Sequence, residues 1–214
     1  MKKILLSTIM ALAFTLLATN LLAQDRMTPS RIHTIVTGEY EPTLFELFKV
    51  SDAKDFVYFV IPSFDSEYCL SYDRMTKSLK LKRAQQNILY DDSDPKDVPL
   101  MDYSLNISDS LFNSLVKMFK ATVLTSSFIS EIRGNDGTTY KFMIDPWWAE
   151  SAECWSPTEN TNCGQAVSVM EKLCEAVKTG DKDAAEGLIE EIERVAKLFE
   201  QYYPAGFDPK KLLY

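Results

Sequence analysis

The chain has 214 residues, of which 46% are hydrophobic, and it carries a formal net charge of −8 at pH 7. This length and apolar content are sufficient for one domain with a sizeable core. An acidic chain without a cluster of basic residues lacks the electrostatic pattern of nucleic-acid-binding proteins, and an anionic membrane surface would repel it. We therefore expect neither nucleic acid nor a membrane surface as a partner.

The first 23 residues have the pattern of a bacterial secretory signal peptide. Lys2 and Lys3 precede a mostly apolar run at 4–18, and small residues precede a cleavage position after Ala23. A core helix or a membrane anchor would have a similar composition, but the run is short for a stable span and polar residues interrupt it at 19–20. Cleavage removes two lysines and no acidic residue, so the formal charge becomes −10. We expect a periplasmic or secreted protein that does not insert into a membrane after cleavage.

The first half of the mature chain predicts mainly strands. Residues 24–42 show no period and predict an extended lead-in, and the segment 44–50 fits either a short helix or a strand. The apolar, β-branched run at 55–62 predicts a buried strand. Apolar residues alternate with polar ones in 66–73 and 78–83, which predicts a hairpin with one dry face.

The period of the pattern changes in the middle of the chain. Residues 101–107 alternate and predict a strand, whereas the next segment predicts a helix at 109–124 with Ser108 as its N-cap. The turn-forming residues 134–137 separate two further β-like runs, 126–133 and 138–144, and so predict a second hairpin.

The last third predicts helices. An apolar stripe from about Cys163 to Lys178 ends near Gly180, and Asp181 can cap a second helix at about 182–202. The short connection predicts an antiparallel helical hairpin.

Four cysteines would enter an oxidising compartment: Cys69, Cys154, Cys163 and Cys174. On one helix, Cys163 and Cys174 would lie roughly 16 Å apart, and a disulfide requires Cα atoms within about 7 Å. Cys154 and Cys163 close a short loop and are therefore the simplest disulfide pair. Cys69 and Cys174 can instead be free, buried thiols that act as small apolar side chains.

Several kinds of catalysis lack the residues they need. The one histidine, His33, lies in the lead-in, and no nucleophile elbow, phosphate-binding loop or dinucleotide fingerprint occurs. The acidic loop 90–97 lacks the central glycine and the final glutamate of a calcium-binding loop, so we interpret it as solvated. The sequence thus predicts no cofactor, no metal and no enzymatic activity of these kinds.

All three tryptophans occur in residues 145–157, which makes this stretch the main candidate binding site. Trp147, Trp148 and Trp155 could form a platform for a glycan or a protein, or they could pack the crossover from the last strand to the terminal helices.

Acidic residues lie beside the tryptophans, namely Asp145, Glu150 and Glu153. Two carboxyl groups at a suitable separation are sufficient for glycoside hydrolysis. A carboxylate-dependent glycoside hydrolase is therefore an alternative function for the same stretch.

Runs of strands followed by runs of helices predict an α+β fold. We expect an antiparallel sheet of about five or six strands, packed by the 109–124 helix and the C-terminal helical hairpin, in a single domain at 43–214. The favoured function is a non-enzymatic binding module for a protein or glycan partner. The alternatives are the hydrolase and an envelope inhibitor of the immunity-protein type.

Overall fold

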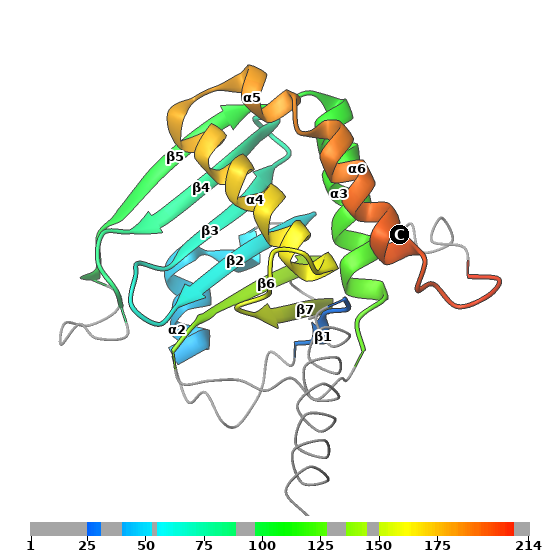
Figure 1. Cartoon of the computed structure of the whole chain (residues 1–214). Helices are drawn as coiled ribbons and strands as arrows, with labels where there is room; N and C mark the ends of the chain where they lie inside the picture. Colours follow the sequence, from blue (N-terminus) through cyan, green and yellow to red (C-terminus); the bar gives the residue numbers. More distant parts are fainter. Residues whose placement is uncertain are drawn as a thin grey trace, which may run out of the picture.

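A computed structural model describes residues 25–30, 40–52, 55–88, 97–127, 136–144 and 150–207. These residues form a seven-stranded, fully antiparallel sheet of order β1-β7-β6-β2-β3-β4-β5 (Figure 1). The strands are β1 Thr28–Pro29, β2 Phe56–Pro62, β3 Tyr68–Asp73, β4 Ser78–Ala84, β5 Leu100–Asn106, β6 Thr138–Ile144 and β7 Glu150–Trp155. The predicted α+β class with an antiparallel sheet is confirmed, and β1 and β7 raise the strand number above the five or six expected.

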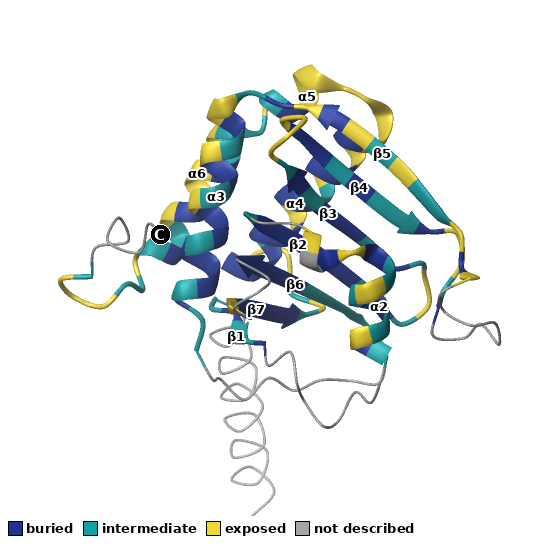
Figure 2. Ribbon diagram, turned by 180° about the vertical axis from the view of Figure 1, so that it is seen from behind, coloured by how far each residue is buried: buried dark blue, intermediate teal, exposed yellow. Residues whose placement is uncertain are grey.

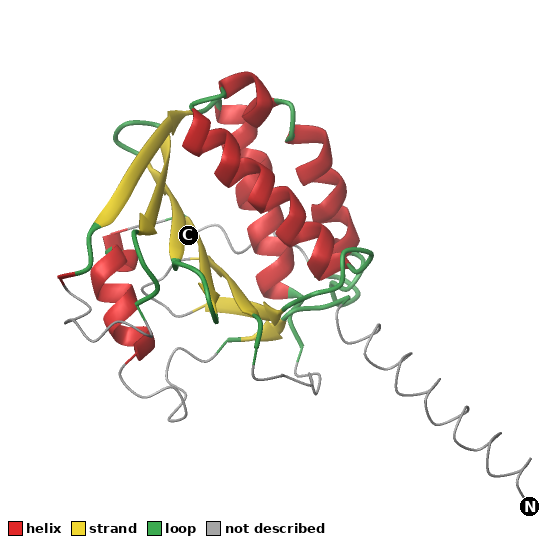
Figure 3. Cartoon of the chain, turned by 60° about the vertical axis from the view of Figure 1, so that its left-hand side comes forward, coloured by secondary structure: helices red, strands yellow, loops and turns green. Residues whose placement is uncertain are grey.

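Helices cover both faces of this sheet unequally. Most of them lie on one face, and α2 lies on the other (Figure 3). The helical elements are α2 Tyr40–Phe48, the 3₁₀ turn η1 Val50–Asp52, α3 Asp109–Leu124, α4 Asn162–Thr179, α5 Lys182–Glu186 and α6 Ile189–Glu200. The ambiguous segment 44–50 is therefore mainly helical.

The strand β2 is buried on both sides because it is the central strand of the sheet. Phe56 and Tyr58 face the large core beneath the helices, whereas Val57 and Phe59 face the smaller core beneath α2. The prediction of a buried strand at 55–62 is confirmed.

The predicted hairpin of β3 and β4 is also confirmed, with Tyr72 opposite Leu79. Its second face is drier than we expected. Cys69 is buried in the core beneath α2, and Lys82 donates through Nζ to the carbonyl oxygen of Phe48 (3.2 Å). The sequence could not predict this, because the covering helix precedes the hairpin in the chain and carries no signal for where it packs.

The helix α3 begins where the sequence predicted. The Ser108 hydroxyl accepts a hydrogen bond from the Leu111 backbone N–H (3.1 Å), as an N-cap should. Glu186 of α5 in turn accepts from the backbone N–H and the hydroxyl of Ser108 (2.8 and 2.6 Å). This contact joins the start of α3 to the turn after α4.

Two predictions for the second half of the chain need comment. The first strand of the predicted second hairpin lies mostly outside the described residues, and β6 pairs with β2 and β7. The single helix predicted at 182–202 is interrupted at Gly187, and α6 packs more extensively along α3 than against α4. The apolar face of α6 thus packs mainly against α3. Local periodicity predicts that a helix has an apolar face, but it does not indicate which element this face packs against.

The predicted disulfide between Cys154 and Cys163 is not present in this structure: all four cysteines are buried, and no disulfide bond joins any two of them. Cys154 lies on β7 and Cys163 lies in the first turn of α4, and both belong to the large apolar core. They act there as small apolar side chains.

Candidate functional site

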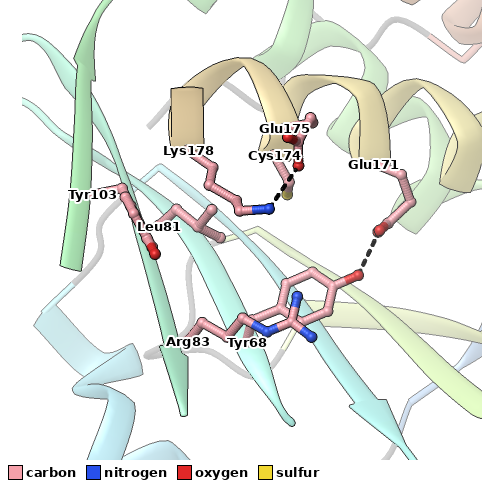
Figure 4. A pocket seen from close by; sticks show the side chains of 8 residues that line it. All are labelled: Tyr68, Leu81, Arg83, Tyr103, Glu171, Cys174, Glu175 and Lys178. Carbon is pink, nitrogen blue, oxygen red and sulfur yellow. Dashed lines mark hydrogen bonds and ion pairs between the residues drawn. The ribbon is translucent and has the colours of Figure 1, made fainter. Parts of the chain in front are cut away.

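A small open pocket lies between the C-terminal half of α4 and the strands β3, β4 and β5 (Figure 4). Its volume is about 60 Å³, which is room for about two water molecules. The lining residues are Tyr68, Leu81, Arg83, Tyr103, Glu171, Cys174, Glu175 and Lys178.

Glu171 is held rigidly at the inner side of this pocket. One carboxylate oxygen accepts from the Tyr58 hydroxyl (2.7 Å) and the other from the Tyr68 hydroxyl (2.6 Å). Burial, followed by the charge of Glu171, raises the pKa of both tyrosines well above its ordinary value. The two phenols therefore keep their protons, and the hydrogen bonds that they donate position the Glu171 carboxylate.

The other charged groups of the pocket are paired. Arg83 donates to both carboxylate oxygens of Asp65 (2.9 and 3.0 Å) and lies over the Tyr68 ring, and Lys178 pairs with Glu175 (3.2 Å). Glu171 makes no ion pair within the described part of the chain.

The pocket contains no activated nucleophile. Burial, together with the negative charge of Glu171, raises the pKa of the Cys174 thiol well above its ordinary value. Reactive cysteines require the opposite shift, because the thiolate is the nucleophile.

A second polar cluster is buried on the other face of the sheet, beneath α2. Lys141 of β6 is 3% exposed and forms ion pairs with Glu41 of α2 (2.9 Å) and Glu153 of β7 (2.6 Å). Its ammonium group also donates to the Ser30 hydroxyl (2.9 Å), which donates to Glu153 (2.7 Å). The second carboxylate oxygen of Glu41 is buried without a hydrogen-bond partner. The cluster ties α2, β6, β7 and the end of β1 together.

This cluster resembles a Ser–Lys dyad only in composition. A lysine that acts as a general base must accept the hydroxyl proton of its serine. The Ser30 hydroxyl donates to Glu153 and not to Lys141. The arrangement is suited to holding elements together and not to nucleophilic attack.

The candidate site residues at 145–157 that the structure describes do not share one environment. Asp145, Trp147 and Trp148 lie outside the described residues. Glu150 is exposed, whereas Glu153 is buried in the Lys141 cluster, and their spacing of three places them on opposite faces of β7. Glu150 and Glu153 are therefore not a facing pair of catalytic carboxyl groups.

Trp155 packs over the backbone at the start of β6. A Cβ atom added to Gly137 would lie 2.5 Å from the Trp155 indole, so the ring is in close contact with that glycine. The next residue, Ser156, has a positive φ of 38° and accepts through its hydroxyl from the Thr138 N–H (2.9 Å). Residues 150–155 are a further strand, since β7 pairs with β6 and β1, and the connection to α4 begins after Trp155.

His33 and most of the acidic loop 90–97 lie outside the described residues. Among the described ones, no group of three or more histidine, cysteine, aspartate or glutamate residues is arranged to hold a metal ion. No helix in the described ranges is long and apolar enough to cross a membrane.

The sheet is open at β5. This strand pairs with β4, and with no other strand among the described residues. Its side chains are largely exposed or half-buried, as the yellow and teal segments of β5 in Figure 2 show. The sequence predicted the strand but not its place at the edge.

The residues around Glu171 were also missed. A tyrosine within the apolar run 56–62 and a glutamate next to the buried Met170 on α4 were the available signals. A buried polar group needs a partner, but the sequence does not indicate that these two groups satisfy each other.

The chain matches no family model, no curated protein and no solved structure.

Proposed function

We propose that this chain is an exported, non-enzymatic binding module whose partner is another protein. The observation that carries the proposal is the open edge of the sheet at β5. A strand edge presents backbone N–H and C=O groups that match the backbone of another extended chain, and many binding modules use such an edge. A glycan has no equivalent repeat of donors and acceptors.

The chemistry of the interior supports a non-enzymatic role. In the pocket, Glu171 is positioned by two tyrosines and the thiol of Cys174 is in its protonated form. On the opposite face, Lys141 is held between two carboxylates. These groups pair with one another and so stabilise the fold. Glu153 is one of the paired residues of the buried cluster, which argues against a catalytic role for it in the hydrolase alternative.

The N-terminal contacts support export with cleavage after Ala23. Arg26 donates to the carbonyl oxygen of Thr125 (2.9 Å), Met27 is fully buried, and β1 pairs with β7. The folded body thus uses the chain from the second or third residue after the proposed cleavage position. A protein processed at this position retains every one of these contacts.

The proposal can be tested by selection of a random-peptide display library on the mature protein. Peptides that bind the wild type and fail to bind the edge variant Ser104→Pro would support it, with Ser104→Ala as the matched control. Ser104 is an exposed residue of β5. The proposal fails if no peptide is enriched, or if the enriched peptides bind both variants equally.

A further inference from the structure

The two edges of the sheet differ in how well they are protected against pairing with another chain. Natural edge strands are usually blocked by shortness, proline, lysine, bulges or inward charges. The β1 edge has two of these features, since it is two residues long and contains Pro29. The β5 edge is seven residues long, contains no proline, glycine or lysine, and pairs with β4 in an unbroken register. Only Asp102 places a charge on it.

The hydrogen bonds that flank β5 define which backbone groups point outward. Ile107 donates to the carbonyl oxygen of Lys77 (3.2 Å), and Gln85 donates to that of Pro99 (3.0 Å). In an antiparallel pair the hydrogen-bonded positions alternate, so the odd-numbered residues of β5 bond to β4. The even-numbered residues therefore direct their N–H and C=O groups away from the sheet: Leu100, Asp102, Ser104 and Asn106.

The two faces of this edge have different chemistry. The side chains of Tyr103 and Leu105 lie on the face of α4 and pack with the large core, and Tyr103 also lines the pocket. The side chains of Asp102, Ser104 and Asn106 lie on the opposite face and are exposed. A strand added beside β5 would thus meet an apolar shoulder on one face and a polar row on the other, in which Asp102 is the one charged residue and lies opposite Lys82 of β4.

We propose that the β5 edge binds an extended segment of a partner protein in which apolar and basic residues alternate. Apolar side chains of the segment extend the layer beside Tyr103, and basic side chains lie beside Asp102. This inference rests on the proposed function and specifies the chemistry of its partner. The negative formal charge of the chain, −8 and −10 after the proposed cleavage, favours a basic partner. The same charge disfavours a second copy of this chain.

The test uses two synthetic heptapeptides with identical apolar positions: acetyl-Val-Lys-Val-Lys-Val-Lys-Val-amide and its counterpart with glutamate in place of lysine. Binding is measured by calorimetry, and the site is located by amide hydrogen exchange. We expect the lysine peptide to bind at least about tenfold more tightly than the glutamate peptide. It should slow exchange at the outward amides of Asp102, Ser104 and Asn106, which exchange rapidly in the peptide-free protein.

Two variants separate the backbone contribution from that of charge. Ser104→Pro removes an outward N–H and no bond to β4, so the sheet is retained while binding weakens about tenfold. If the proline variant does not fold, Asp102→Lys tests the same edge through side-chain charge, and it should abolish the preference for lysine over glutamate.

The inference is overturned if both peptides bind equally or not at all, or if the slowed amides lie outside β5. It is also overturned if the outward amides are protected without peptide in a concentration-dependent manner, which would indicate a second copy. Library peptides that protect β5 but lack the apolar–basic alternation would refute this inference and leave the proposed function standing.

Discussion

Replacement of Lys141 by methionine tests whether the buried cluster holds α2 to the sheet. Methionine keeps the length and apolar body of the lysine and removes its charge. Glu41 and Glu153, each less than 10% exposed, then lose the ammonium group that lies 2.9 and 2.6 Å from them. Their negative charges stay in a poorly solvated environment.

Removal of one partner from a buried ion pair costs about 3 to 5 kcal/mol, because the remaining charge is uncompensated. Two carboxylates share Lys141, so we expect a loss of about 4 kcal/mol in the free energy of unfolding. With an m-value of about 2 kcal/mol per molar urea, the unfolding midpoint should fall by about 2 M.

Urea unfolding monitored by circular dichroism measures this shift. Lys80→Met is the matched control, since Lys80 is half-buried on β4 and forms no ion pair within the described residues. The control should change stability by less than about 0.5 kcal/mol. A loss of less than about 1 kcal/mol in Lys141→Met, or a loss equal to that of the control, would refute the reasoning.

Three further predictions use other parts of the fold. Met27→Ala should lower the free energy of unfolding by about 2 to 4 kcal/mol, because a fully buried side chain is truncated. As a control, a chain that begins at Gln24 should be as stable as the full chain. A smaller loss in Met27→Ala would show that the segment around β1 is not needed for stability. Glu171→Leu leaves the hydroxyls of the buried Tyr58 and the half-buried Tyr68 without their partner and should cost about 1 to 3 kcal/mol in urea unfolding, with the exposed Glu175→Leu as control. The four buried thiols should react with Ellman's reagent only after unfolding, and thiols missing from that titration would point to a disulfide.

Cys69 adds a dependence on alkaline pH. Burial raises its pKa from 9.0 to about 12, so the unfolded chain releases this proton at lower pH than the folded one. The thiol's contribution to stability is therefore complete below pH 9 and is lost as the pH rises toward 12. Unfolding experiments across this range should give a steeper decline for the wild type than for Cys69→Ala, and equal slopes would contradict the assignment.

The elements that the sequence predicted correctly are those in which one local signal is sufficient. The strand at 55–62 is set by a run of β-branched and aromatic residues, and the start of α3 by a serine before an amphipathic segment. The helix α4 ends at Gly180 because its left-handed conformation, with φ of 73°, favours glycine. Each of these depends on neighbours within a few positions in the chain.

The candidate site depends on contacts that local patterns do not contain. Glu171 meets Tyr58 across 113 positions and Tyr68 across 103 positions, and Lys141 meets Glu41 through the packing of α2. The order of the predicted strands and helices correctly indicated an α+β fold, but it could not assign partners to buried polar groups. That assignment requires the order of the strands.

The tryptophan stretch contains a strand that local sequence patterns did not predict. Apolar alternation at 150–155 was hidden by glutamates at 150 and 153, one of which is buried only because Lys141 lies beside it on the neighbouring strand. The sequence determined the acidic charge, the class of the fold and most of its local elements. Only the tertiary structure placed β5 at the open edge, because strand order is set by which apolar faces pack together over long separations in the chain, and these separations carry no periodic signal.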